Sequence, residues 1–296
     1  MWVGVTPRFR RLNEALGLTD DQLQDGNTKQ TGVRQCLQRA YYGEASEHPP
    51  GFLVGSWGRG TAIRPPQDID IFFPLPFHVY GRINDNAGNV QSALLAEVRG
   101  HLLRTYPQSA IRGDGQVVIV GFNSVAIEVV PVFLYDENRR YVMPDTNAGG
   151  RWKIVAPLAE LHLLEAADAS SGGNARVMAR MLKVWKRECN VPLNSYLVEM
   201  LATEFIASYE YRERDWYYFD WFMRDFFSWL CLQGCRNMII PGTGELVNLG
   251  SDWLSRAETA RGRALTACDY ERNDFTTLAG EEWQKIFGHR IPIHVI

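Results

Sequence analysis

The sequence predicts an α+β protein in which a mixed β-sheet packs against a C-terminal helical lobe, with the active site in the cleft between them. Short apolar runs bounded by turn residues dominate residues 50–155, as expected of strands. From Pro157 onward, apolar residues recur almost entirely at helical spacing. We therefore expect two domains, one of N-terminal helices plus the sheet over residues 1–155 and a helical lobe over residues 156–296.

The helices and strands can be placed along the chain from this periodicity. Residues 8–46 predict one or two helices behind the sheet, interrupted near Gly26-Asn27. Strands are expected at 52–54, at 68–73 and over 116–134, where Gly121 to Ser124 form a turn between two strands. One helix, 90–106, interrupts the strands. In the lobe, the expected helices are 157–168, 174–189, 195–209, 215–232, 252–268 and 277–287.

Two aspartates stand in the apolar strand of residues 68–73. Successive side chains of a strand alternate between its faces, so Asp68 and Asp70 point the same way while Ile69 and Ile71 pack on the other side. A solvated pair at a strand edge is the simplest reading of such a motif. The apolar flanks favour a metal site instead, because charges do not enter a buried strand without a partner, and Mg²⁺ prefers carboxylate oxygens.

A Gly-Ser turn precedes the two aspartates. The apolar run 52–54 stops at Gly55-Ser56, which predicts a strand, a tight turn and the start of a helix. Glycine lets a backbone approach a phosphate closely, while a serine hydroxyl and the free amides of a helix start donate to phosphate oxygens. Gly55 and Ser56 are therefore candidate triphosphate ligands.

A third carboxylate lies farther along the chain. Glu128 is the only acid in the apolar stretch 116–134, so it reaches solvent at an edge or faces polar groups and metal. With Asp68 and Asp70 it completes the set of anionic ligands that a two-metal site requires. Phosphoryl or nucleotidyl transfer is the chemistry that this set predicts.

Composition limits the classes of partner. The 296 residues are 46% hydrophobic, with net charge -3 and a pI near 6.1, which favours small nucleotides over long nucleic acid. The sequence has no long apolar run and no signal-peptide pattern, so we expect a cytoplasmic protein that does not bind membranes. Five scattered cysteines argue against a disulfide framework, and Cys231 and Cys235 lack the further ligands of a zinc site.

The motifs together resemble one enzyme family. GSWGRGTAIRPPQDIDIFFPL and IEVVPVF resemble the CD-NTases, bacterial enzymes related to cyclic GMP-AMP synthase and to oligoadenylate synthetase within the polymerase-beta-like nucleotidyltransferase superfamily. The resemblance extends to RWKIVAPLAELH, to ARMLKVWKRECNVPLNSYLVEML and to AGEEWQKIFGHRIPI, and so covers nearly all of the chain after residue 50. The chain departs from many members at Glu128, where they carry aspartate; the longer side chain still reaches a metal.

The resemblance implies a site and an activity. It assigns Asp68, Asp70 and Glu128 to two Mg²⁺ ions, or Mn²⁺ in their place, and Lys183 and Ser195 to the donor triphosphate. It implies a cyclic di- or trinucleotide made from ATP, GTP, UTP or CTP, in antiphage (CBASS) signalling through an operon-encoded effector. We expect a monomer, and no conjugation to a partner at Ile296, because the chain ends in a short apolar segment.

Two other functions remain open. A related nucleotidyltransferase would move a single NMP to one small-molecule or protein acceptor. A silent nucleotide-binding module would bind triphosphate without turnover, although three acids in apolar strands are costly without a metal. A serine before an apolar helical run, such as Ser195, can cap the helix, bind phosphate or do both; the residues alone favour the cap, whereas the resemblance implies a triphosphate ligand.

Overall fold

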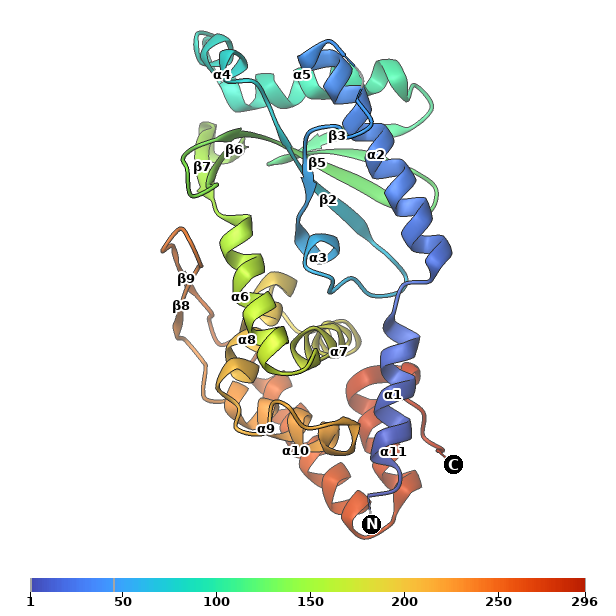
Figure 1. Ribbon diagram of the computed structural model, residues 1–296. Helices are drawn as coiled ribbons and strands as arrows, with labels where there is room; N and C mark the ends of the chain where they lie inside the picture. Colours follow the sequence, from blue (N-terminus) through green and yellow to red (C-terminus); the bar gives the residue numbers. More distant parts are fainter. Residues whose placement is uncertain (1, 45, 296) are drawn as a thin grey trace. The chain divides into compact units, whose positions relative to one another are not determined.

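The computed structural model describes residues 2–44 and 46–295; Ile296, where we expected no conjugation, lies outside these ranges. The chain divides into two compact units (Figure 1). The first combines the residues up to Gly17 with His162–Ile240 and the segment from Gly244 onward. The second consists of Leu18–Leu161 and Pro241–Thr243.

The second unit contains a seven-stranded mixed sheet, which confirms the predicted α+β class. Its central order is β1-β2-β5-β4-β3, and β6 pairs with the end of β5 and with β7. Within the described part of this unit, β2 and β5 pair in parallel and the other strand pairs are antiparallel. The strands are β1 (Phe52–Leu53), β2 (Asp68–Pro74), β3 (Ala110–Asp114), β4 (Val117–Gly121), β5 (Ala126–Leu134), β6 (Tyr141–Asp145) and β7 (Arg151–Val155).

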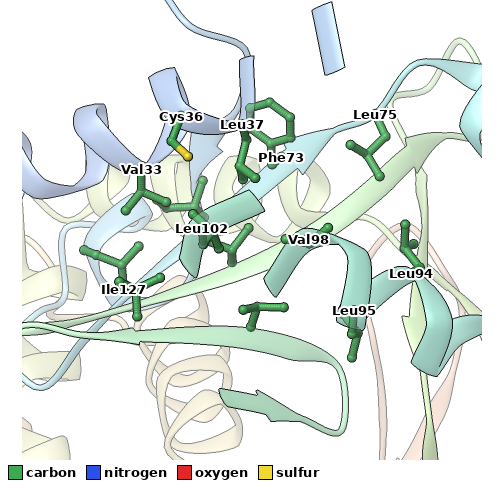
Figure 2. Close-up of a cluster of buried hydrophobic side chains, with 14 of the residues drawn as sticks. Val33, Cys36, Leu37, Phe73, Leu75, Leu94, Leu95, Val98, Leu102 and Ile127 are labelled. Atoms are coloured by element: carbon green, nitrogen blue, oxygen red, sulfur yellow. The ribbon is translucent and has the colours of Figure 1, made fainter. Parts of the chain in front are cut away.

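Helices cover one face of this sheet. The main core forms there between the strands and two helices, with Val33 and Leu37 from α2 and Leu94, Val98 and Leu102 from α5 (Figure 2). The opposite face carries a smaller apolar cluster made of Phe72, Val130, Val132, Tyr141 and Met143. The helices of the unit are α2 (Asp20–Tyr42), α3 (Gly55–Gly58), α4 (Phe77–Asn84), α5 (Val90–Thr105) and η1 (Asn147–Gly149), and α6 (Pro157–Ser170) begins in it.

Helix α2 runs through Gly26 without the interruption that the sequence predicted. A Cβ atom at Gly26 would lie 2.5 Å from Cη2 of Trp57 and 2.8 Å from Cδ1 of Ile69. Glycine is therefore required here by close packing of the helix on α3 and β2, and it does not break the helix. The break comes earlier, where Thr19 caps α2 by accepting a hydrogen bond from the Gln22 amide.

We expect Gly26→Ala to destabilise the protein by about 2 kcal/mol, although alanine is the better helix former, because overpacking outweighs helix propensity. Urea unfolding followed by circular dichroism measures the change. Gly100 is the matched control, since it lies inside α5 and a Cβ there meets nothing within 4 Å. Equal effects of Gly26→Ala and Gly100→Ala would contradict the packing explanation.

The first unit is almost entirely helical, but its first helix differs from the prediction. Helix α1 (Val5–Leu16) belongs to this unit, whereas the sequence predicts it with the sheet. The Phe9 ring packs 5.1 Å from Trp283, and the buried Arg8 side chain donates from Nε to Glu271 at 3.2 Å. Aromatic packing and a buried ion pair thus bind α1 to the C-terminal helices.

The remaining elements of the first unit follow the predicted helices closely. A short hairpin, β8–β9, was not predicted; its two strands flank the glycines 242 and 244. Among the described residues, no helix is both long and apolar enough to cross a membrane. The elements are α7 (Asn174–Glu188), α8 (Ser195–Ser208), η2 (Trp216–Tyr218), α9 (Phe219–Leu230), β8 (Asn237–Ile239), β9 (Leu246–Asn248), α10 (Leu254–Arg272), α11 (Thr276–Phe287) and η3 (Gly288–Arg290).

Candidate active site

Three carboxylates meet on the sheet face opposite the main core. The parallel register pairs Asp70 of β2 with Glu128 of β5 and places Asp68 opposite Ala126, two residues before Glu128. Because side chains alternate along a strand, all three acids point to the same face. Each offers one carboxylate oxygen, and these oxygens lie within 4.8 Å of one another. The sheet therefore brings together the three acids that the sequence singled out.

The three acids concentrate negative charge on a half-buried part of the sheet face. Burial, followed by the charges of Asp68, Asp70 and Asp114, raises the pKa of Glu128 to about 7, with Arg112 acting in the opposite direction. Such a cluster gains from a bound cation, and three carboxylate oxygens suit a hard divalent ion such as Mg²⁺. The donor set therefore fits the metal site that the motif predicted.

The Gly-Ser turn lies directly against Asp70. Gly55 has φ +58°, and a Cβ atom there would stand 1.8 Å from Oδ2 of Asp70. The amide of Val54 donates to the carbonyl of Asp70 at 2.9 Å, which ties the start of the turn to β2. Gly55 opens α3, so the first amides of this turn have no acceptor within the helix. The half-buried Ser56 follows Gly55 in this turn.

An ion pair supports the far end of the turn. Arg59 is the C-cap of α3, and its Nη1 lies 3.7 Å from Oε2 of Glu160 in the first turn of α6. The two side chains are largely buried, at 11% and 16% exposure, so solvent screens the pair only weakly. The pair joins the turn to the residues that follow the sheet.

The two remaining candidates, Lys183 and Ser195, belong to the first unit. Nζ of Lys183 in α7 lies 3.2 Å from Oε1 of Glu199 in α8. Ser195 is the first residue of α8, and the N-cap is Asn194, whose side chain accepts from the Tyr196 amide at 2.8 Å. The capping role that the residues alone favoured for Ser195 is therefore wrong, because its neighbour fills that position.

Glu199 is a residue that the sequence analysis missed. The signal for it was present, since Glu199 is the only acid in the apolar run from Tyr196 to Ala202. The same reasoning that selected Glu128 applies to it, because an acid inside a buried element needs a partner. Here the partner is Lys183.

Solved structures share this architecture over nearly the whole chain. CdnC of E. coli MS115-1 with ATP matches with a TM-score of 0.68 at 18% identity, covering 99% of this chain and 100% of that chain. DncV, the cyclic AMP-GMP synthase of Vibrio cholerae, in complex with a linear intermediate, matches with a TM-score of 0.74 at 14% identity, covering 97% and 96%. Among curated proteins, none matches the chain.

This chain has the fold of DncV, and its sheet carries the cluster of three acids. The model of the Second Messenger Oligonucleotide or Dinucleotide Synthetase (SMODS) domain matches residues 4–167, more than half of the chain. The chain therefore belongs to this family. The predicted resemblance to the CD-NTases is confirmed by this match together with the likeness to CdnC and DncV.

Proposed function

We propose that this protein joins nucleoside triphosphates into a cyclic di- or trinucleotide second messenger, in bacterial antiphage signalling. The observation that carries the proposal is the group of Asp68, Asp70 and Glu128 oxygens within 4.8 Å of one another, on strands next to the Gly-Ser turn. Family membership supports the type of product. CdnC solved with ATP and DncV solved with a linear intermediate support triphosphates as substrates.

Each site residue has a proposed role. Asp68, Asp70 and Glu128 would hold two Mg²⁺ ions, or Mn²⁺ in their place. When bound, such ions neutralise phosphate charge and lower the pKa of an acceptor hydroxyl for in-line attack on the α-phosphorus, with pyrophosphate leaving. Because Glu128 must be ionised to act as a ligand, its raised pKa makes metal binding depend on pH near neutrality.

The other residues would hold the donor triphosphate. Gly55 brings its backbone within contact distance of Asp70, and Ser56 offers a hydroxyl beside the amides of the α3 start. In the first unit, Lys183 carries a positive charge, and Ser195 offers a hydroxyl that does not serve as the helix cap. The product would be read by an effector protein, and no long nucleic acid is required.

Purified protein incubated with labelled nucleoside triphosphates and Mg²⁺ tests the proposal. We expect a phosphatase-resistant product, identified by mass spectrometry, that disappears in Asp68→Ala plus Asp70→Ala, with a loss of at least about 1,000-fold because the charge at the metal site falls by two. Asp20→Ala plus Asp21→Ala is the control, since these adjacent aspartates are exposed at the start of α2. Formation of the product by the Asp68→Ala plus Asp70→Ala variant would overturn the proposed function. A single NMP on an acceptor would point to the alternative transferase, and triphosphate binding without pyrophosphate release to a silent module.

A further inference from the structure

Glu199 of α8 is a buried carboxylate, which is costly unless a partner stabilises it. It is 1% exposed, within a helix whose neighbouring residues Val198 and Met200 are also buried. A buried carboxylate that lacks a partner is strongly disfavoured. Helix α7 packs against α8, and it supplies the ammonium group of Lys183 at 3.2 Å.

The two members of this ion pair differ in their access to solvent. The Lys183 side chain is 11% exposed, whereas that of Glu199 is 2% exposed, so the lysine is the more accessible member. Glu199 also stands four residues after the half-exposed Ser195 in α8, which places both on the same side of the helix. The ion pair therefore holds the ammonium group of Lys183 at a residue that lies one helical turn from Ser195.

We propose that Glu199 is a positioning residue for nucleotidyl transfer, which holds the ammonium of Lys183 beside Ser195 so that both can receive the donor triphosphate. This inference rests on the proposed function, in which Lys183 and Ser195 bind the triphosphate. A lysine side chain has four rotatable bonds, and fixing them before the ligand arrives lowers the entropy cost of binding. The buried Glu199 supplies this restraint and does not touch the nucleotide.

The test separates positioning from simple helix packing. Glu199→Gln keeps the shape of the side chain and an acceptor oxygen but removes the charge that attracts Lys183. We expect the KM for the triphosphate to rise about tenfold, with kcat changed less than about twofold, because the loss falls on binding. Calorimetric titration with non-hydrolysable triphosphate analogues and Mg²⁺ should show the same loss of affinity.

A double-mutant cycle shows whether Glu199 acts through Lys183. In a Lys183→Gln background, Glu199→Gln should cause no further loss of affinity, because the group that it positions is already gone. Glu204→Gln is the matched control, since Glu204 lies in the same helix and pairs with Arg236 at 2.6 Å in a more exposed place. Its KM should equal that of the wild type.

Further variants keep the proposal testable if Glu199→Gln does not fold. Glu199→Asp retains the charge on a shorter side chain and should give a KM between the wild type and Glu199→Gln. The double variant removes both charges and leaves no unpaired ion in the interior. An unchanged or lower KM in folded Glu199→Gln or Glu199→Asp overturns the inference, as does an equal loss from Glu199→Gln with and without Lys183. If the wild type binds triphosphate but forms no oligonucleotide, the proposed function fails while the binding cycle still decides the role of Glu199.

Discussion

Gly55→Ala should abolish nucleotidyl transfer in a protein that still folds. The new Cβ atom would stand 1.8 Å from Oδ2 of Asp70, far inside van der Waals contact, so the carboxylate or the turn must move. A displacement of about 1 Å at a reacting centre costs on the order of 100-fold in rate, and here the displaced group is a proposed metal ligand. Product formation from labelled triphosphates measures the loss, and thermal unfolding checks that the fold is kept.

Gly88→Ala is the matched control for this variant. Gly88 has a φ of +86°, so alanine there is also strained in the left-handed region, at about 1 kcal/mol, but a Cβ meets nothing within 4 Å. We expect Gly88→Ala to lower stability slightly and to keep full activity. If Gly55→Ala retains more than a tenth of wild-type activity, the close approach of the turn to Asp70 is not required for catalysis.

The acid cluster could be predicted from the sequence because its signal is local. Asp68, Asp70 and Glu128 each interrupt an apolar strand, and burial makes a lone carboxylate costly wherever the strand lies in the sheet. The sequence could not show that β2 and β5 pair in parallel, which sets Glu128 opposite Asp70. That register depends on contacts between segments almost 60 residues apart.

Tertiary contacts explain why two predictions from the sequence are wrong. The sequence predicts a helix break near Gly26, because a single sequence does not reveal that Trp57 occupies the space of its missing side chain. The order of the chain predicts helix α1 with the sheet that it precedes, whereas Phe9 packs against Trp283 near the other end of the chain. Tertiary packing overrides local pattern in both cases.

Ionised Glu128 should destabilise the metal-free protein. Its pKa is raised from 4.5 to about 7, first by burial and then by Asp68 and Asp70, so folding favours the protonated form. The stability that Glu128 contributes is therefore complete below about pH 4.5 and is lost as the pH rises through 7. Glu128→Gln cannot ionise, so in EDTA its melting temperature should exceed that of the wild type at pH 8, with the difference shrinking at pH 5.

Mg²⁺ should reverse this order. At pH 8 the ionised wild type gains stability from a ligand that binds only the folded state, whereas Glu128→Gln, with one carboxylate fewer, gains much less. At pH 5 the wild type should also gain little, because protonated Glu128 is a poor ligand. Thermal unfolding of both proteins at the two pH values, in EDTA and in Mg²⁺, gives all four comparisons.

Glu97→Gln is a control in the same unit, for which we expect the opposite change of melting temperature at pH 8 in EDTA. Hydrogen bonds from Arg82 lower the pKa of Glu97, so its contribution is present above its ordinary pKa and is lost as the pH falls. Removing that charge should lower the melting temperature at pH 8 in EDTA, where Glu128→Gln raises it, and Mg²⁺ should stabilise Glu97→Gln as it does the wild type. A metal-free Glu128→Gln protein that melts below the wild type at pH 8 would show that the three carboxylates do not repel one another strongly enough to require a cation.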